Sequence, residues 1–199
     1  MSEIVEDVRR FVEEECKKPN SNYGLDAYDH LIHVKKYAET LAEEFNVDLE
    51  LIKLAALLHD IGSIMKGREN HHINGAEIAE NKLKELNYPD DKIELIKKCI
   101  LNHRGSINNS KESNEEKIIA DADAMASFNN IDGLFITALV YEKRERRDAR
   151  KSVLNKIINS WNKLSFEESK KIIKPKFEAA MLLLGEKDEG ENKFREVER

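Results

Sequence analysis

The sequence predicts an all-α protein, a single helical bundle with extra helices at its C-terminal end. No stretch shows the two-residue alternation of a β-strand, whereas apolar residues recur at the helical period along nearly the whole chain. Glycine and proline number only 8 and 3, and Lys, Glu and Ile are abundant, a composition that favours long helices with short joints. A length of 199 residues fits one domain with one core.

The N-terminal part of the chain contains three predicted helices. The first covers residues 3–16 and is followed by Pro19, and the second covers residues 26–45. Asp48 is a suitable cap for the third, which we expect to end at Gly62. The apolar stripes of these helices include Val8, Val12, Leu31, Val34, Ala38, Leu41, Leu51 and Leu54.

The rest of the chain adds further predicted helices separated by polar loops. The predicted helices cover residues 72–86, 90–103, 115–128, 133–147, 153–161 and 165–184. Residues 66–70 and 105–114 are rich in polar residues or in Ser, Asn and Gly, and are expected to be loops. We expect one domain over residues 1–184, with the C-terminal helices at 153–184, and a charged, flexible tail at 185–199.

Charge and cysteine content limit the classes of function. The formal net charge of −6 argues against broad binding of nucleic acid or anionic membranes. Two scattered cysteines do not form a disulfide framework, so a cytoplasmic setting is expected. No apolar run approaches the ~20 residues that span a membrane, and the acidic start differs from a signal peptide.

The pair His59-Asp60 is the first candidate for a functional site. It directly follows the apolar run Leu54-Ala55-Ala56-Leu57-Leu58, which carries both side chains into the interior at a helix end. A buried carboxylate beside a buried imidazole is costly unless a cation satisfies both groups. A divalent metal ion would do so, with an anionic oxygen and a neutral nitrogen as ligands.

Two other helices supply partners of the same chemical type. His30 lies on the core-facing stripe of its helix, because Val34 and Ala38 follow at the helical spacing. Asp121 and Asp123 lie in an apolar stretch, where carboxylates also need a partner. A set of His30, His59, Asp60 and Asp121 would be the kind of metal site that helical bundles build in their interior.

The order and surroundings of these residues resemble the HD-domain superfamily of metal-dependent phosphohydrolases. The resemblance covers residues 20 to 150 approximately, and His33 stands where many relatives carry Arg. The matching blocks are Tyr28-Asp29-His30-Leu31-Ile32-His33-Val34, Leu57-Leu58-His59-Asp60-Ile61-Gly62, His72-Ile73-Asn74-Gly75, Ile100-Leu101-Asn102-His103 and Asp121-Ala122-Asp123.

The resemblance implies an HD-type bundle in which His30, His59, Asp60 and Asp121 hold a divalent metal ion. It places two further histidines at His72 and His103, which would bind a second ion, contact phosphate or transfer protons. The mixed N/O ligand set suits Mn, Fe, Co, Ni or Zn better than Mg, with one or two ions. An activated water would then hydrolyse a phosphate ester.

Several other residues next to the motifs have open roles. Asp123 would either orient a ligand histidine or a water, or lie on the helix surface. His71 is expected to be a surface neighbour of His72, and the basic run 143–151 is expected to be a solvated face. The cations that could hold phosphate oxygens are Arg104, Lys117, Lys66 and Arg68.

Two alternative functions remain open at this point. Some HD-fold proteins are di-iron oxygenases with a similar ligand set, and others could bind a nucleotide as signalling or scaffold proteins without turnover. The first expectation is a small phosphorylated substrate, a nucleotide by family analogy. No nucleic-acid or membrane partner is expected, and a homo-oligomer is left open.

Overall fold

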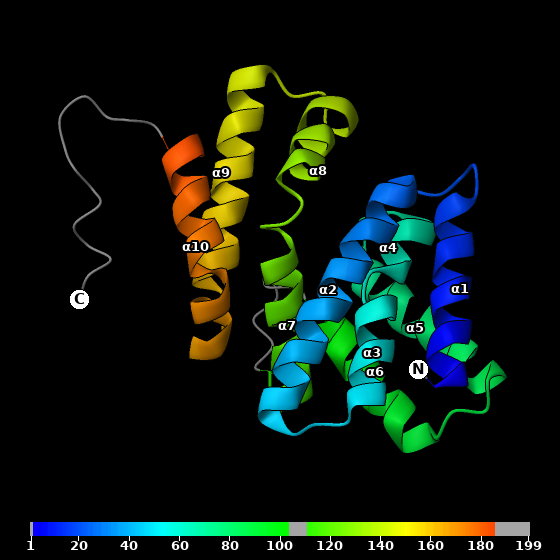
Figure 1. Ribbon diagram of the computed structural model, residues 1–199. Helices are drawn as coiled ribbons and strands as arrows, with labels where there is room; N and C mark the ends of the chain where they lie inside the picture. The colour runs from blue at the N-terminus through cyan, green and yellow to red at the C-terminus, as the bar shows by residue number, and fades with distance from the viewer. Residues whose placement is uncertain (1, 104–110, 186–199) are drawn as a thin grey trace.

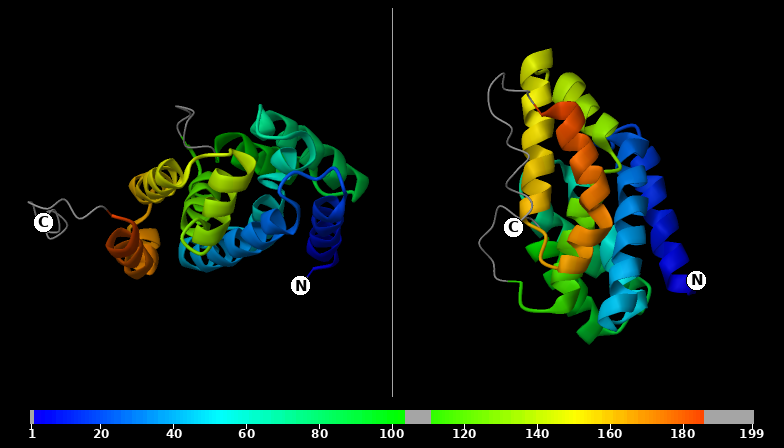
Figure 2. Two further views of the ribbon diagram at one scale, coloured as in Figure 1. Left: turned by 90° about the horizontal axis from the view of Figure 1, so that it is seen from above. Right: turned by 60° about the vertical axis from the view of Figure 1, so that its left-hand side comes forward.

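The computed structural model describes residues 2–103 and 111–185, and within these ranges it contains helices and no strand. Figures 1 and 2 show an all-α bundle, as predicted. The helices are α1 (Glu3–Lys17), α2 (Gly24–Phe45), α3 (Leu49–Leu58), α4 (Ile61–Lys66), α5 (His71–Glu85), α6 (Asp90–Asn102), α7 (Asn114–Ala126), α8 (Ile131–Ile136), α9 (Arg146–Asn162) and α10 (Glu167–Leu184). A π-helical turn, η1 (Thr137–Tyr141), continues α8.

The bundle has two parts that meet at α2 and α7. Helix α2 packs on α1, α3 and α7, while α5 packs on α4 and α6. Helices α9 and α10 form a hairpin beside α7, together with α8, on the other side of the molecule (Figure 1). The main core is formed by the apolar stripes, with Leu31, Leu41 and Ile52 fully buried.

The third predicted helix is interrupted where the functional residues stand. Asp48 caps it as predicted, because its carboxylate accepts hydrogen bonds from the backbone N–H groups of Glu50 and Leu51. The helix ends at Leu58 rather than at Gly62, and a new helix starts at Ile61. His59 and Asp60 therefore occupy the bend between α3 and α4.

Helices α4 and α5 touch through their backbones at two glycines. A Cβ atom on Gly62 would lie 2.1 Å from the carbonyl oxygen of His71 and 2.5 Å from the backbone nitrogen of Gly75. Only a residue without a side chain permits this approach. The contact therefore fixes where α5 starts relative to the bend at Asp60.

The predicted helix over 133–147 is wrong in its second half. The helix ends in η1 at Tyr141, and Lys143 has a positive φ of 52°. Residues 142–147 are all charged, so this stretch has no apolar side chain that could bury a helical face. The next helix, α9, starts at Arg146, earlier than the predicted 153, and takes up part of the basic run.

Other segments differ less from the prediction. Asn114, which the sequence predicts to lie in a loop, begins α7, because the Ser113 side chain caps that helix by accepting from the Glu116 N–H. The remaining loop residues 105–110 and the tail residues 186–199 lie outside the described residues. None of the described helices is long and apolar enough to cross a membrane.

Candidate metal centre

His59 is fully buried and has one ring nitrogen left for a ligand. Its Nδ1 lies 2.8 Å from the Ala56 carbonyl oxygen, which can only accept, so Nδ1 carries the proton and donates. This tautomer leaves a lone pair on Nε2, which is buried and has no hydrogen-bond partner in the structure. A buried acceptor without a donor suits a cation, and a backbone bond to the other nitrogen is typical of metal-binding histidines.

His30, His59 and Asp60 form the first group of candidate ligands. One ligand atom from each lies within 4.8 Å of the others. The Asp60 Oδ2 is 3.8 Å from the His59 Nε2. Asp123 adjoins this group, because its Oδ1 lies 3.3 Å from the His30 Nε2 and 4.0 Å from the His59 Nε2.

Asp60, His71 and His103 form a second group that shares Asp60 with the first. The Asp60 Oδ1 lies 3.5 Å from the His71 Nε2 and 3.7 Å from the His103 Nε2. The two oxygens of one carboxylate thus face two different sets of histidines. Asp60 could therefore serve as a ligand in both groups if each held a divalent ion.

The histidines of the second group, like His59, bond through Nδ1 to a backbone carbonyl oxygen. The Nδ1 of His71 donates to the Arg68 carbonyl oxygen at 2.9 Å, and that of His103 donates to the Ile100 carbonyl oxygen at 2.6 Å. Each bond joins a ring to the residue three positions earlier, which lies in the α4–α5 loop for His71 and in the last turn of α6 for His103. The Nε2 atoms are left directed toward Asp60.

The electrostatics of the cluster keep the ligands in the protonation states that bind metal. Burial, together with the nearby His59, lowers the pKa of His103 to about 4, so the ring is neutral at pH 7. Burial raises the pKa of Asp60, but His59 and His103 outweigh it, and the net pKa is below the usual value. The pKa of Asp123 is likewise well below its usual value, because Lys163 and His30 outweigh burial.

The structure places Asp121 away from this cluster, contrary to the expectation that it is a ligand. Its fully buried carboxylate accepts hydrogen bonds from the Ser165 N–H, at 2.8 and 2.9 Å, and from the Phe166 N–H at 3.0 Å. These N–H groups stand at the start of α10, so Asp121 caps that helix from α7. We therefore replace Asp121 by Asp123 in the proposed ligand set.

The structure likewise gives His71 the position that the sequence motif assigns to His72. Within the described part of the chain, His71 and not His72 joins the group with Asp60 and His103. His71 lines the central cavity, and the two rings are nearly perpendicular, with centroids 5.8 Å apart. His33 lies one turn after His30 on α2. Its Nδ1 bonds to the Asp29 carbonyl oxygen at the protein surface.

Of the described cations that the sequence predicts to contact phosphate, Arg68 lines the cavity and the two lysines do not. Arg68 lines the cavity and forms an ion pair with Glu142 at 3.5 Å. Lys66 is exposed, and neither Lys66 nor Lys117 is among the residues that line this cavity. Arg104 lies outside the described residues. The sequence motifs did not indicate two further cavity residues, Lys156 on α9 and Lys163 directly after it, because both lie beyond these motifs.

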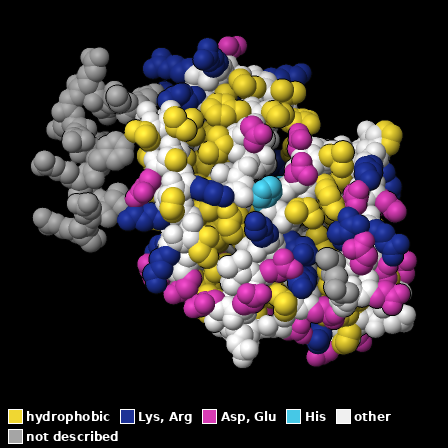
Figure 3. Space-filling model, viewed as in Figure 1, with side chains coloured by type: hydrophobic (Ala, Val, Ile, Leu, Met, Phe, Trp, Pro, Cys, Tyr) yellow, Lys and Arg dark blue, Asp and Glu magenta, His cyan; other side chains and the backbone are white. Residues whose placement is uncertain are grey.

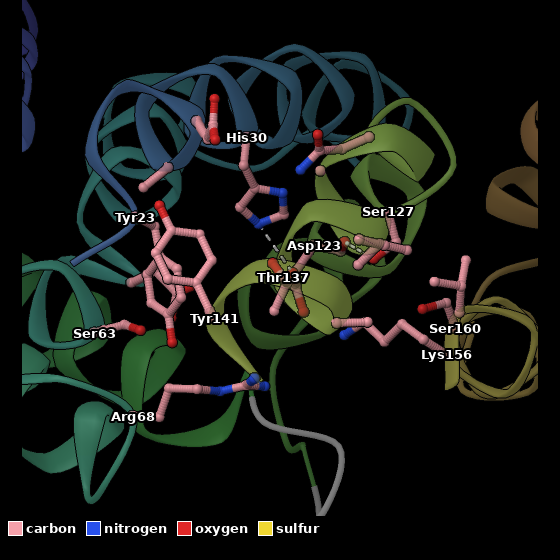
Figure 4. A pocket seen from close by; sticks show the side chains of 18 of the residues that line it. Tyr23, His30, Ser63, Arg68, Asp123, Ser127, Thr137, Tyr141, Lys156 and Ser160 are labelled. Atoms are coloured by element: carbon pink, nitrogen blue, oxygen red, sulfur yellow. Dashed lines mark hydrogen bonds and ion pairs between the residues drawn. The ribbon is translucent and has the colours of Figure 1, made fainter. Parts of the chain in front are cut away.

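The residues of the cluster other than the fully buried His59 line a cavity of 730 Å³, together with residues of α2, α7, η1 and α9. Figure 3 shows a histidine exposed in a hollow between the two parts of the molecule. Figure 4 shows Tyr23 and Tyr141 on one side of this cavity and Lys156 and Ser160 on the other. The two tyrosine rings meet edge to face at 5.3 Å. The volume is that of a small-molecule site rather than of an ion alone.

Curated proteins similar to this chain include much longer enzymes. Ribonuclease Y of Mycoplasma mycoides subsp. mycoides is 33% identical over 134 residues, which cover 63% of this chain and 24% of that protein. The tRNA (cytidine(56)-2'-O)-methyltransferase of Picrophilus torridus is 31% identical over 134 residues, which cover 60% of this chain and 37% of that protein. The chain thus spans about a quarter of the length of the ribonuclease Y relative and little more than a third of the methyltransferase.

Two solved structures have the same fold over almost their full length. A protein from Listeria innocua matches with a TM-score of 0.70 at 21% identity, covering 92% of this chain and 94% of the other. An HD-superfamily hydrolase from Bacillus thuringiensis matches with a TM-score of 0.69 at 19% identity, covering 90% and 92%. The family model described as HD domain matches residues 27–127, which is just over half of the chain. Together with the order of the motifs, this match shows that the chain belongs to the HD-domain family.

Proposed function

We propose that this protein is a metal-dependent hydrolase of phosphate esters whose substrate is a nucleotide or a related small phosphate. The observation that carries the proposal is the position of Asp60. Its two carboxylate oxygens face two separate sets of histidines, and Asp60 lines a substrate-sized cavity. Such a shared carboxylate has a clear use in a centre that holds two divalent ions.

The ligands fall into two sets in this proposal. His30, His59, Asp60 and Asp123 hold the first ion, and Asp60, His71 and His103 hold the second. The donor atoms are imidazole nitrogens and carboxylate oxygens, which suit Mn, Fe, Co, Ni or Zn better than Mg. His103 acts as a ligand rather than in proton transfer, because its two ring nitrogens are committed to the Ile100 carbonyl and the Asp60 side.

Divalent ions held by these residues would supply the nucleophile, by lowering the pKa of a water, and would polarise a phosphoryl oxygen. The protein's own side chains supply positioning. Arg68 and Lys163 line the same cavity and can contact the remaining phosphate oxygens. Lys163 also holds Asp123, with its Nζ 3.3 Å from the Asp123 Oδ2, so that the Oδ1 stays turned toward His30.

The comparisons support a phosphodiester as the first bond to test. Ribonuclease Y, to which the chain is 33% identical over 134 residues, is by its name a nuclease, and the similar fold in Bacillus thuringiensis is described as a hydrolase. The chain covers only a quarter of ribonuclease Y and carries a net charge of −6. We therefore propose a small nucleotide rather than a long nucleic acid as the substrate.

The test combines metal analysis with a substrate panel. The purified protein is analysed for bound metal, stripped, reloaded with Mn, Co, Ni or Mg, and assayed with phosphomonoesters and phosphodiesters. His59→Ala should lose both bound metal and hydrolysis. His33→Ala is the matched control, because His33 lies on the same helix as His30, its Nδ1 bonds to the Asp29 carbonyl, and it is in neither group of candidate ligands among the described residues.

Full hydrolysis by a metal-free His59→Ala protein would refute the proposal. Iron as the native metal, with oxygen consumption and no hydrolysis of any phosphate ester, would replace it by an oxygenase.

A further inference from the structure

We propose that one face of α9 binds a second phosphate group of the substrate, apart from the phosphate that is hydrolysed. This inference rests on the proposed function and narrows the substrate to phosphodiesters that carry an additional phosphate. The face consists of Lys156, Asn159 and Ser160, which line the cavity, whereas Lys163 directly follows the helix and pairs with Asp123. The spacing of Lys156, Asn159 and Ser160 puts them on one side of the helix.

The face is polar although it is turned toward the interior of the molecule. Ser160 is 1% exposed, and its hydroxyl oxygen is buried without a hydrogen-bond partner in the structure. Buried hydroxyl groups normally have a hydrogen-bond partner, so the Ser160 hydroxyl is a candidate contact for a ligand in the cavity. A phosphate oxygen is a suitable acceptor for the serine O–H and the Asn159 amide.

Lys156 is the lysine of this face that forms no close ion pair within the described part of the chain, although its charge also acts on Asp123. Among the described residues, no carboxylate lies within ion-pair distance of its ammonium group, whereas Lys163 is paired with Asp123. Figure 4 shows the Lys156 side chain reaching from α9 into the cavity toward Thr137. The two lysines are seven positions apart, which corresponds to about 10 Å along the helix axis. This separation suits two anionic groups of one ligand better than a single one.

The neighbouring basic run is a poorer candidate for the same task. A second hollow shares Lys156 and Asn159 with this cavity and is also lined by Lys143, Arg144 and Lys151. These cations are interleaved with Glu142, Glu145 and Asp148, and Arg144 forms an ion pair with Glu142. The charges in this hollow largely compensate one another. We therefore assign the second phosphate to the α9 face and not to the run 143–151.

The experiment compares two dinucleotides that differ in one phosphate. The probe pApA carries a terminal phosphate, and ApA lacks it, while the phosphodiester between the two sugars is the same. Attack of water at phosphorus breaks the bond to the leaving sugar oxygen, which takes up a proton. The products are two AMP from pApA, and adenosine with AMP from ApA. The ratio of kcat/KM for pApA to that for ApA measures the contribution of the terminal phosphate.

The wild-type protein should prefer pApA by about 10-fold, the effect of one charge-assisted contact of roughly 1.4 kcal/mol. Lys156→Ala should abolish most of this preference through a higher KM for pApA, Lys156→Arg should retain it, and Ser160→Ala should reduce it by a smaller factor. Lys171→Ala is the matched control, because it removes the same charge at an exposed site on α10 and should keep the full preference.

Calorimetric binding of both dinucleotides to the metal-free protein gives a second readout that needs no turnover. Absence of hydrolysis with tighter binding of pApA would refute the proposed function but support the α9 subsite. Equal affinity for both dinucleotides in the wild-type protein, or a preference that survives Lys156→Ala, would overturn the subsite.

Discussion

Replacement of Asp121 by alanine should destabilise the protein and leave its metal content intact. The Asp121 carboxylate is the acceptor for the backbone N–H groups of Ser165 and Phe166 at the start of α10. A hydrogen bond to a charged group contributes about 1.5–3 kcal/mol, and two N–H groups lose their acceptor. Water can enter the space left by the side chain and bond to the two N–H groups. We therefore expect the free energy of unfolding to fall by the lower value for two such bonds, about 3 kcal/mol. For a chain of this size that corresponds to a fall in Tm of about 6–12 °C.

Urea unfolding followed by tryptophan fluorescence suits this measurement. The protein has a single tryptophan, Trp161, which stacks on Phe177 of α10 at a centroid distance of 4.4 Å and therefore reports on the α9–α10 hairpin. Metal content is measured on the same samples. Asp132→Ala is the control, since Asp132 is exposed and its removal should change stability by less than about 0.5 kcal/mol.

Asp123→Ala supplies the comparison at the metal centre. It should lose bound metal, because the Asp123 Oδ1 lies 3.3 Å from the His30 Nε2. If Asp121→Ala instead lost its metal while its unfolding midpoint stayed at the wild-type value, our account of the two carboxylates would be refuted, and Asp121 would regain the role of a ligand.

Three further predictions concern separate parts of the molecule. Asp60→Ala should lose both ions, whereas His71→Ala should keep the first and lose the second; equal stoichiometry in the two variants would contradict a shared carboxylate. Asp48→Ala removes the cap of α3 and should cost about 1 kcal/mol in urea unfolding, while Asp48→Asn, which still caps, should cost less. Burial raises the pKa of the Cys16 thiol to about 11, so the folded state favours the protonated thiol. Stability from this group is therefore present below pH 9 and lost as the pH rises toward 11, and Cys16→Ala should show a smaller loss over that window. Alkylation of Cys16 at pH 8 should accordingly be slow until urea unfolds the protein; rapid labelling of the native protein would contradict its burial.

The helical class and the His59-Asp60 pair could be predicted from the sequence because both depend on local pattern. The apolar run before His59 predicts that the pair is carried inward; His59 is fully buried, whereas the Asp60 side chain is 29% exposed because it faces the cavity. The side chain of Asp48 likewise caps α3 as its position in the sequence indicated. These features involve neighbouring residues only.

The choice between close neighbours depends on helix rotation, which the local pattern does not determine. Asp121 and Asp123 are two positions apart, so their side chains point about 200° apart around α7. Both lie in the same alternation with alanine, and only the packing of α2 on one side and α10 on the other assigns their roles. His71 and His72 differ by about 100°, and the start of α5 decides which ring faces Asp60.

The contact between Gly62 and Gly75 has a consequence for metal stoichiometry. In the proposed centre, Asp60 directly precedes α4 and His71 begins α5, so the distance between these two ligands depends on how closely the backbones of α4 and α5 approach. A single methyl group at position 62 would force α5 outward and draw His71 away, while His30 and the ring of His59 are held by α2 and α3. A glycine without any functional group is thereby one of the residues that decide whether the centre is dinuclear or mononuclear.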